Sequence, residues 1–471
     1  MSMDWRIPSI PEFKHWKYPS PWIPAVALIV VVIAGFILTI LNWKQGEAIL
    51  SGTFFLFALV VPLLLWGAFC ALLYQSYEDW NTRVDWWNYL CKDHFADWRD
   101  WARWDLALLD TVTLTPEVQL AERMAALDGT PPANGGKSPK LAQRDFAALL
   151  TQLVEPLMPH LARFAGKSTI HIALQTSHET HVAQLRGVLQ ALEVPNLEHI
   201  AVSRVEANEC SALLDTWMTN QTVRYDYDHD RRKRTPDLCL LLACQLQEEG
   251  AAPCTEAAVA LLFASWNLLR AKKLKPKARL FRSMPTTTDD IPDAIKTLVT
   301  AEPTPVKRLK HMWISGLSKP DGHVMRAAVK DSEPELTLLD LEHAIGLPGP
   351  ASPLLMQALA AELMQYGQGP QVVVTPAAEG VRLNLIGKDY APIARAVEPN
   401  LSLIQMSTSY GFVCLTVLLL ILGEAGEFGP GWFWGIAAAG LVFLLIVQPA
   451  AQIFKRRAVT QEFYERARSG G

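Results

Sequence analysis

Four apolar stretches, two near each end of the sequence, constrain the fold of this chain more than any other feature. They cover residues 22–41, 53–74, 405–423 and 432–454, and none of them contains Asp, Glu, Lys or Arg. A helix needs about 20 predominantly apolar residues to cross the hydrocarbon core of a bilayer. We therefore predict four transmembrane helices, arranged as two hairpins that bracket a large central region.

Alternative interpretations of these stretches are a secretory signal and a buried core helix. A signal peptide is a single shorter apolar run with a cleavage site, and a second span does not follow it closely. Pro62 in the second stretch is compatible with a membrane helix, where such kinks are tolerated. Burial in a soluble core remains an alternative, mainly for the shorter third stretch.

The Lys and Arg residues beside the four stretches predict their orientation. The N-terminal tail carries three basic residues, and the tail after the last stretch carries five. The turn between the first two stretches carries Lys44 alone, and the turn at 424–431 carries none. Because basic flanks stay on the cytoplasmic side, we expect a multi-pass protein of the bacterial inner membrane, with both termini and the large domain in the cytoplasm.

Composition narrows the classes of partner and cofactor. The net charge of −4 over 471 residues does not suggest a nucleic-acid-binding protein. The seven cysteines have no CxxC spacing, and free thiols fit a reducing cytoplasm. We therefore expect no nucleic acid as a partner, and the four apolar stretches predict that the lipid bilayer is one.

The chain divides into six regions by composition and periodicity. We expect an N-terminal tail and hairpin at 1–77 with helices at about 22–41 and 53–74, a Trp-rich juxtamembrane helical region at 78–127, a Pro/Gly-rich linker at 128–141, a cytoplasmic α/β domain at 142–395, a second hairpin at 405–454 and a basic tail at 455–471.

The Trp-rich region has a helical repeat. Trp98, Trp101 and Trp104 recur every three residues, which places them on neighbouring parts of one helical face. Such a helix either lies along the membrane surface or docks on the second hairpin. Packing against the soluble domain is an equal alternative.

Residues 142–395 alternate short apolar runs with helical segments such as 180–193 and 352–366. The strand-like runs are 170–174, 199–203, 238–244, 258–264, 278–282, 311–315, 371–375 and 381–386, and the last two form a predicted hairpin. Strands interleaved with helices favour a layered α/β domain with a largely buried sheet.

Neither a metal site nor a cofactor site is predicted. The Gly-Gly-Lys-Ser sequence within 128–141 lacks the first glycine of a phosphate loop, and no strand precedes it. His171, His178 and His181 have no nearby carboxylate to complete a ligand set. The acidic and basic run at 225–234 is interpreted as an exposed loop, because its bases neutralise its acids.

Residues 270–282 contain seven basic residues and no acid. We interpret this run as a solvated turn. The alternative is a contact with an anionic leaflet, at about 1 kcal/mol per basic residue near the surface.

From about residue 200 the order of features resembles the thiolase and ketoacyl-synthase family. The sequence ECSALLDTWM places Cys210 at a helix start, and PDLCLLLACQL and EGAAPCTEAAVALLFAS resemble the strands that follow it. IGLPGPASPLLMQALAAEL resembles the glycine-rich segment of the family, and QVVVTPAAEGVRLNLI its closing hairpin. The resemblance implies a thiolase-like fold with Cys210 in the place of the nucleophile.

The sequence departs from that family at both catalytic histidines. WISGLSK, in the place of the first histidine loop, has no histidine, and Leu347 stands beside Gly346 where the second would be. His323 and His343 are close but out of register. A thiol alone does not move the protons that acyl transfer demands. No catalytic residue is therefore assigned. Cys210 is the one weak candidate, reactive if a helix N-terminus lowers its pKa. The favoured interpretation is that Cys210 is a small buried residue.

The layout also resembles accessory membrane proteins associated with type VI secretion effectors. Together the two resemblances imply a non-enzymatic adaptor or scaffold whose degenerate domain binds an effector or its carrier, and which is able to form a homodimer through that domain. Two alternatives stay open, namely a thioester or acyl-transfer enzyme that uses Cys210 and an immunity protein against a secreted toxin.

Overall fold

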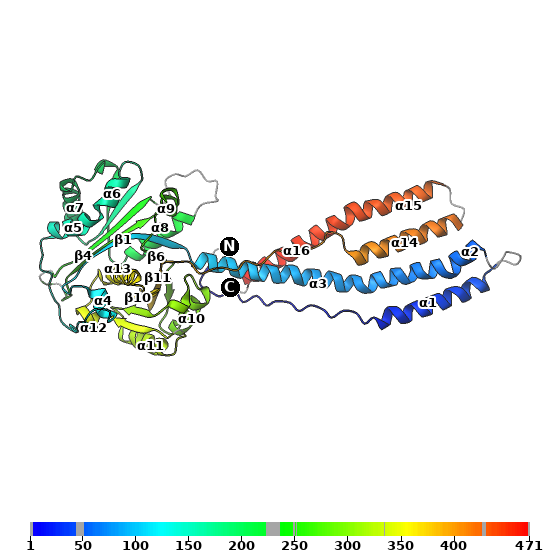
Figure 1. Ribbon diagram of the computed structural model, residues 1–471, viewed down its shortest axis with the longest axis horizontal. Coiled ribbons are helices and arrows are strands. Elements are labelled where there is room, and N and C mark those ends of the chain that lie inside the picture. Colours follow the sequence, from blue (N-terminus) through cyan, green and yellow to red (C-terminus); the bar gives the residue numbers. More distant parts are fainter. Residues whose placement is uncertain are drawn as a thin grey trace. The chain divides into compact units, whose positions relative to one another are not determined.

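The computed structural model describes residues 3–43, 51–222, 236–247, 250, 252–333, 335–425 and 430–469 (Figure 1). Packing divides the chain into two compact units, which are considered separately. The α/β unit consists of Met1–Ile7 and Asp97–Ile393, and the helical unit consists of Pro8–Ala96 and Ala394–Gly471.

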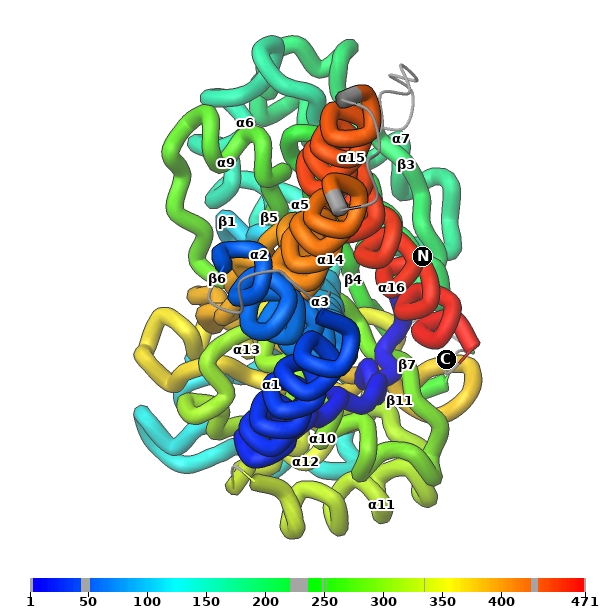
Figure 2. The backbone as a smooth tube through the Cα atoms, turned by 90° about the vertical axis from the view of Figure 1, so that its right-hand side faces the viewer, coloured from blue at the N-terminus to red at the C-terminus, as the bar shows by residue number. Residues whose placement is uncertain are grey.

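The helical unit contains the four apolar stretches. They form α1 (Trp22–Leu41), then α2 (Gly52–Phe55), η1 (Leu56–Val60) and α3 (Val61–Ala102), then α14 (Met406–Ala425), and finally α15 (Pro430–Val442), η6 (Phe443–Val447) and α16 (Gln448–Ser469). Among the described residues, four helical segments are long and apolar enough to cross a membrane. Within the unit, α1 packs against η1 and α14 packs against α15, so the stretches pair as two hairpins (Figure 2).

The tryptophans of α3 in the helical unit are covered by other segments of the same unit. Trp87 is fully buried, with its ring stacked on Phe13 at a centroid distance of 4.7 Å and edge-on to Phe463 at 5.3 Å. Trp86 donates its indole N–H to Thr460 Oγ1 at 2.9 Å. Phe463 and Thr460 belong to α16, so this part of α3 docks on the helix that continues the second hairpin.

The three regularly spaced tryptophans pack within the α/β unit instead. Trp98 is buried and donates its indole N–H to the backbone oxygen of Asp4 at 3.0 Å. The Arg282 guanidinium lies 4.4 Å from the ring centroid of Trp101 and 4.6 Å from that of Trp104. For these residues the structure favours packing against the globular domain over a position at the membrane surface.

Eleven strands form one mixed sheet among the described residues of the α/β unit. They are β1 (Asp105–Leu114), β2 (Ile170–Gln175), β3 (Ile200–Val205), β4 (Leu238–Gln245), β5 (Ala257–Ala264), β6 (Ala278–Phe281), β7 (Met284–Thr286), β8 (His311–Ile314), β9 (Thr337–Asp340), β10 (Gln371–Pro376) and β11 (Val381–Gly387). β4 and β5 are continuous apolar runs and almost fully buried, as expected for strands covered on both faces. β10 and β11 form the predicted hairpin.

The strand order occurs twice. It is β3-β2-β4-β5-β1 in the first half and β9-β8-β10-β11-β6 in the second, with β7 added beside β11. In each half the first three of these strands are parallel and the fourth is antiparallel to both of its neighbours. The equivalent strands β1 and β6 pair antiparallel, with Leu106 opposite Leu280. The unit is therefore a duplication of one α/β motif about the β1–β6 pair.

Helices cover both faces of each half (Figure 1). They are α4 (Leu120–Met124), α5 (Phe146–Val154), α6 (Met158–Phe164), α7 (Thr180–Ala191), α8 (Cys210–Thr222), α9 (Trp266–Lys272), α10 (Ile291–Ala301), α11 (Lys319–Lys330), α12 (Leu341–Ile345) and α13 (Ser352–Gln365). One core cluster joins α5, α6, α7 and α9 to the first half, a second joins α10 and α11 to the second half, and a third holds α8 and α13 against both. Each half of the continuous sheet forms one β layer, and α8 and α13 pack between the two halves. The result is five layers, α-β-α-β-α, in which α13 is buried on nearly all sides.

The first departure from the expected boundaries is β1. It lies in the region 78–127, which was expected to be helical, and the helix α3 ends before it at Ala102. The tryptophan repeat favours a helix as far as Trp104, the residue before β1. The strand is defined by its two neighbours, β5 and β6, both distant in sequence.

The second departure is the expected linker, residues 128–141, which we term the strap. Its backbone is hydrogen-bonded to the α/β unit at three points. Asn134 N donates to His343 O at 3.0 Å, Leu347 N donates to Lys137 O at 2.9 Å, and Glu256 N donates to Pro139 O at 3.0 Å. Proline and glycine exclude a helix or a strand here, but they do not exclude an ordered coil fixed by its neighbours.

Candidate functional site

Cys210 occupies the first position of α8, after the loop that leaves β3. Its side chain is 5% exposed, and its Sγ donates to Glu206 O at 3.4 Å and to Gln175 Oε1 at 3.6 Å. Burial, and then the negative charge of Glu209, raise the pKa of the Cys210 thiol to about 12. The helix N-terminus therefore does not lower the pKa of the Cys210 thiol, because desolvation of the thiolate outweighs the helix dipole.

Cys210 lines a cavity of about 340 Å³, which we term the Cys210 cavity. The wall combines residues of both halves of the duplicated unit, from β2 and α8 in the first half and from α13, β10 and β11 in the second. Apolar wall residues include Leu214, Met218, Leu280, Pro350, Leu354 and Pro376. The cavity lies where the two halves meet, so no single stretch of sequence defines it.

The charged residues of the Cys210 cavity neutralise one another. Arg382 Nη1 donates to Asp215 Oδ2 at 2.8 Å and to Ser283 Oγ at 3.2 Å. Ser283 Oγ in turn donates to Asp215 Oδ1 at 2.9 Å. Arg382 comes from β11, Asp215 from α8, and Ser283 from the turn between β6 and β7. The Asp215 carboxylate is therefore tied to a cation and a hydroxyl, and the wall carries no net charge from this pair.

Carboxamides are the other main polar groups of the wall, contributed by Gln175, Asn208, Gln357 and Asn384. Gln175 is fully engaged, since its Nε2 donates to Pro350 O at 2.7 Å and its Oε1 accepts from Cys210. Gln357 is 6% exposed, and its Oε1 has no hydrogen-bond partner within the described part of the chain. Buried polar atoms are usually paired, so this oxygen needs an explanation.

No histidine is among the residues that line the Cys210 cavity in the described part of the chain. His323 on α11 and His343 on α12 are both exposed, and His343 lies beside the strap, with its backbone oxygen bonded to Asn134. Leu347 is bonded through its backbone to the strap and to Thr255. The structure therefore places neither off-register histidine beside Cys210.

The histidines considered for a metal site are only partly brought together. His178 and His181 have ring centroids 5.1 Å apart, and His181 Nδ1 is 2.7 Å from Thr176 Oγ1. His171 is bonded elsewhere, with its Nε2 2.8 Å from Ser203 Oγ. Across the described residues no cluster of three ligand-type side chains is suited to a metal ion. The run 225–234 lies outside the described residues.

The basic run at 270–282 does not form one uniform surface. Lys277 pairs with Asp110, and Arg279 Nη1 donates to Asp105 Oδ2 at 2.8 Å. Arg282 lies over the rings of two tryptophans. Several basic residues of the run 270–282 thus stabilise the β1–β6 region. The interpretation of this run as a solvated turn does not predict these contacts.

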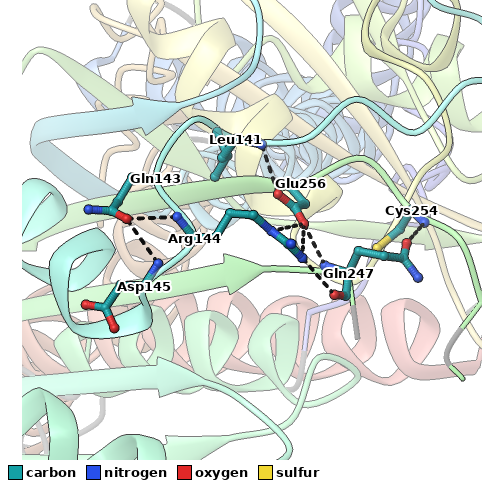
Figure 3. Close-up of polar contacts among 7 residues, drawn as sticks. All are labelled: Leu141, Gln143, Arg144, Asp145, Gln247, Cys254 and Glu256. Carbon is teal, nitrogen blue, oxygen red and sulfur yellow. Dashed lines mark hydrogen bonds and ion pairs between the residues drawn. The ribbon is translucent and has the colours of Figure 1, made fainter. Parts of the chain in front are cut away.

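A second polar cluster fixes the chain that follows the strap (Figure 3). The side chain of Glu256 is fully buried, and its Oε2 accepts from Leu141 N at 2.9 Å. Its Oε1 accepts from Arg144 Nε at 3.1 Å and from Gln247 N at 3.3 Å. A buried carboxylate with this many donors is a structural tie between the strap and the start of β5.

The residues of the Cys210 cavity other than Cys210 were not identified from the sequence. Gln357 and Asn384 each interrupt a buried apolar run, LLMQALAAEL and VRLNLI. A polar residue inside a run that must be buried is a signal of a buried site. That signal does not show that α13 and β11 face the same cavity as α8.

Neither the protein-family models nor the curated proteins gave a match to this sequence. Solved structures are similar to it. They include an oxazolomycin ketosynthase domain of Streptomyces albus (10% identity, 64% of this chain and 100% of that chain, TM-score 0.41). They also include the peroxisomal 3-ketoacyl-CoA thiolase of Saccharomyces cerevisiae (10% identity, 61% and 98%, TM-score 0.39). That thiolase is described as a five-layered α-β-α-β-α structure built from two core domains of identical topology.

These two structures are a ketosynthase and a thiolase, the two enzyme groups that the sequence resembles. Both TM-scores are below 0.5, so the fold class rests on the strand order and layers of this chain, and no residue role is transferred.

Proposed function

We propose that this chain is a non-enzymatic inner-membrane adaptor. In this proposal the helical unit anchors the protein in the bilayer, and the α/β unit is a degenerate thiolase-like domain that binds a protein partner on the cytoplasmic face. Support comes from four helical segments of sufficient length and apolarity and from the basic residues of both tails.

The observation that carries the non-enzymatic part is the chemistry around Cys210. Its thiol is buried, with a pKa of about 12, and the described lining of the cavity offers no histidine. The one carboxylate in that lining, Asp215, is engaged by Arg382 and Ser283. Thiolate attack and proton transfer both need a general base, and the described wall holds neither a histidine nor an unpaired carboxylate that could act as one.

The partner class that the sequence resemblance implies is a type VI secretion effector or its carrier. The boundaries predicted above, with both termini and residues 142–395 on the cytoplasmic side, are part of the same proposal, as is homodimerisation through the α/β unit.

Site-specific crosslinking in the native cells tests the adaptor role. A photoreactive amino acid is placed in the full-length chain at Ala378, at the rim of the Cys210 cavity, and at the exposed Lys296 on α10 as the control position. We expect a discrete adduct with one protein at Ala378 and none at Lys296. Equal adducts at both positions, or none at Ala378, would remove the support for a partner at this face.

The enzymatic alternative is tested on the same full-length protein in detergent. An acyl thioester that transfers its acyl group to Cys210, with the acylation lost in Cys210→Ala, would contradict the proposal. We expect no acylation of Cys210 at neutral pH.

A further inference from the structure

The helical unit contains a pocket of about 430 Å³ between α3 and α16, which we term the α3–α16 pocket. The two helices run side by side here (Figure 1), and Trp86 on α3 donates its indole N–H to Thr460 on α16 at 2.9 Å. Beside Trp86, the pocket is lined by residues of α16, namely Ile453, Arg456, Arg457, Thr460, Gln461 and Tyr464. This described lining contains two arginines and no acidic residue.

The two arginines of the α3–α16 pocket differ from the lysine that precedes them. Lys455 Nζ pairs with Asp79 Oδ1 at 2.8 Å. Neither Arg456 nor Arg457 has a carboxylate within ion-pair distance in the described part of the chain. The Arg456 guanidinium instead lies 5.8 Å from the ring centroid of Trp86. The pocket therefore carries two positive charges that no described side chain neutralises.

The other polar groups of the lining show which donors are left for a ligand. Thr460 Oγ1 donates to Arg456 O at 2.8 Å, and Gln461 Nε2 donates to Glu465 Oε1 at 3.0 Å. The hydroxyl of Tyr464 has no hydrogen-bond partner among the described residues. Two guanidinium groups and one phenol hydroxyl are thus available. Guanidinium groups bind phosphate oxygens through short, charge-assisted hydrogen bonds.

The α3–α16 pocket begins where the helices leave their apolar segments. Ile453 belongs to the last turn of the apolar stretch 432–454, and Lys455 is the first charged residue after it. At this level Lys455 and Ser407, near the start of α14, bond to acidic side chains of α3. A helix rises 1.5 Å per residue, so Arg457 lies about 6 Å beyond Ile453. The headgroup layer of each leaflet is roughly 5–8 Å thick.

From these observations we propose that the α3–α16 pocket binds the phosphate group of an anionic phospholipid of the cytoplasmic leaflet. Arg456 and Arg457 bind the phosphate oxygens, Tyr464 donates its hydroxyl, and Ile453 contacts the apolar part of the lipid. The two unneutralised charges favour a headgroup with a net negative charge, such as phosphatidylglycerol. They disfavour a zwitterionic headgroup, because its ammonium group is repelled by the arginines. This inference rests on the membrane anchor of the proposed function.

A general attraction of basic residues to an anionic leaflet makes a different prediction. In that case every basic residue at the same depth contributes alike. In a phosphate site, Arg457 contributes and Lys455 does not, although the two are near neighbours in α16 and carry the same charge. Lys455→Gln is therefore the matched control for Arg457→Gln.

The test is native mass spectrometry of the full-length protein in detergent, titrated with phosphatidylglycerol or with phosphatidylcholine of the same acyl chains. We expect one phosphatidylglycerol to bind about tenfold more tightly than phosphatidylcholine, and Arg457→Gln to lose about this factor. Arg457→Lys should lose about threefold, because lysine keeps the charge without the planar fork. Lys455→Gln should change binding less than about twofold.

Two results would overturn the proposal. One is an equal loss of phosphatidylglycerol in Arg457→Gln and Lys455→Gln, which is the signature of general attraction. The other is equal binding of the two lipids to the wild-type protein, a comparison that needs no variant. Arg457 is exposed and has no side-chain partner in the described chain, so its variants should keep the Tm of the wild type.

Inorganic phosphate separates a lipid from a soluble phosphate as the source of the ligand. At millimolar concentration we expect it to leave phosphatidylglycerol bound, because the acyl chains hold the headgroup beside the pocket. Displacement of the lipid by inorganic phosphate would overturn the assignment to a lipid. Loss of lipid selectivity in a protein that still resists carbonate extraction would overturn this inference alone. Release of the protein by carbonate would instead remove the anchor on which the inference rests.

Discussion

At the scale of single residues, Cys210 illustrates how burial decides reactivity. A cysteine at the first position of a helix is a common arrangement for a low-pKa nucleophile. Here the side chain is buried and faces Glu206 O and Gln175 Oε1, neither of which stabilises a thiolate. The neighbouring charge of Glu209 acts in the same direction.

We therefore predict that Cys210 is alkylated slowly by iodoacetamide. With a pKa of about 12, its thiolate fraction at pH 7.5 should be roughly a thousandfold below that of an ordinary cysteine. The rate should rise about tenfold per pH unit up to pH 10 without a plateau. Mass spectrometry of the tryptic peptide measures it, with partly exposed Cys254 as the internal control. A plateau below pH 9 would contradict the burial argument.

Glu362 on α13 is a second residue whose environment sets its titration. Burial raises the pKa of Glu362 from 4.5 to about 7. The hydrogen bond from Thr113 Oγ1, at 2.9 Å, lowers this pKa, and the nearby charge of Glu122 raises it further. The folded state thus holds this proton more tightly than the unfolded state does. The stability that comes from this tighter binding is complete below about pH 4.5 and is lost as pH rises through 7.

Glu362→Gln should therefore raise the free energy of unfolding at pH 8 by about 1–3 kcal/mol and should have little effect at pH 4.5. Urea unfolding of the full-length protein in detergent, followed across this pH range, measures the difference. An equal effect at both pH values would show that the substitution acts through packing.

At the scale of elements, the strap shows how an irregular segment becomes part of a folded unit. Gly346 ends α12 with φ +108°, a conformation that is essentially restricted to glycine. A Cβ at Gly346 would collide with the backbone oxygen of Lys137, in the strap, and with Thr255 Oγ1. The close approach of α12 and the strap thus depends on the absence of a side chain.

Gly346→Ala should destabilise the α/β unit by about 3–5 kcal/mol, the sum of backbone strain and steric overlap. Gly367→Ala is the matched control. Gly367 has φ +72°, and no atom lies within 4 Å of the position that a Cβ would take, so its cost should be about 1 kcal/mol. Chemical denaturation of both variants compares them, and limited proteolysis should show the strap cleaved faster in Gly346→Ala alone.

At the scale of the whole molecule, the proposal requires that lipid is the solvent for the four apolar helical segments. The residues of α1 carry large exposed apolar side chains, among them Ile29, Ile33 and Leu41. In water this surface would favour aggregation, and in a bilayer it faces a medium of its own polarity.

We predict that the full-length protein stays in the membrane fraction after alkaline carbonate extraction and needs detergent for release. In inside-out vesicles, protease should cleave between residues 150 and 390, and in intact spheroplasts this region should be protected. Cleavage in spheroplasts would reverse the orientation derived from the basic flanks. Release by carbonate would contradict the membrane anchor itself.

The sequence by itself determined the features that depend on local apolar periodicity. The first and third apolar segments, the strands β4, β5, β10 and β11, and the helix α13 were predicted near their observed bounds, because each must bury a continuous or periodic set of apolar side chains. The helices of the second and fourth segments continue past the predicted bounds, to Ala102 and Ser469. The strand β1 was missed because its partners β5 and β6 lie far away in the chain.

Only the tertiary structure decided the duplication and the cavity. The repeated strand order follows from pairings between distant segments, for which no local pattern codes. Cys210, Gln357 and Arg382 share one wall because the two halves meet there, and burial at that junction set the pKa of the thiol. Apolar burial is a property of short segments, whereas the environment of a polar group is a property of whatever the fold places beside it.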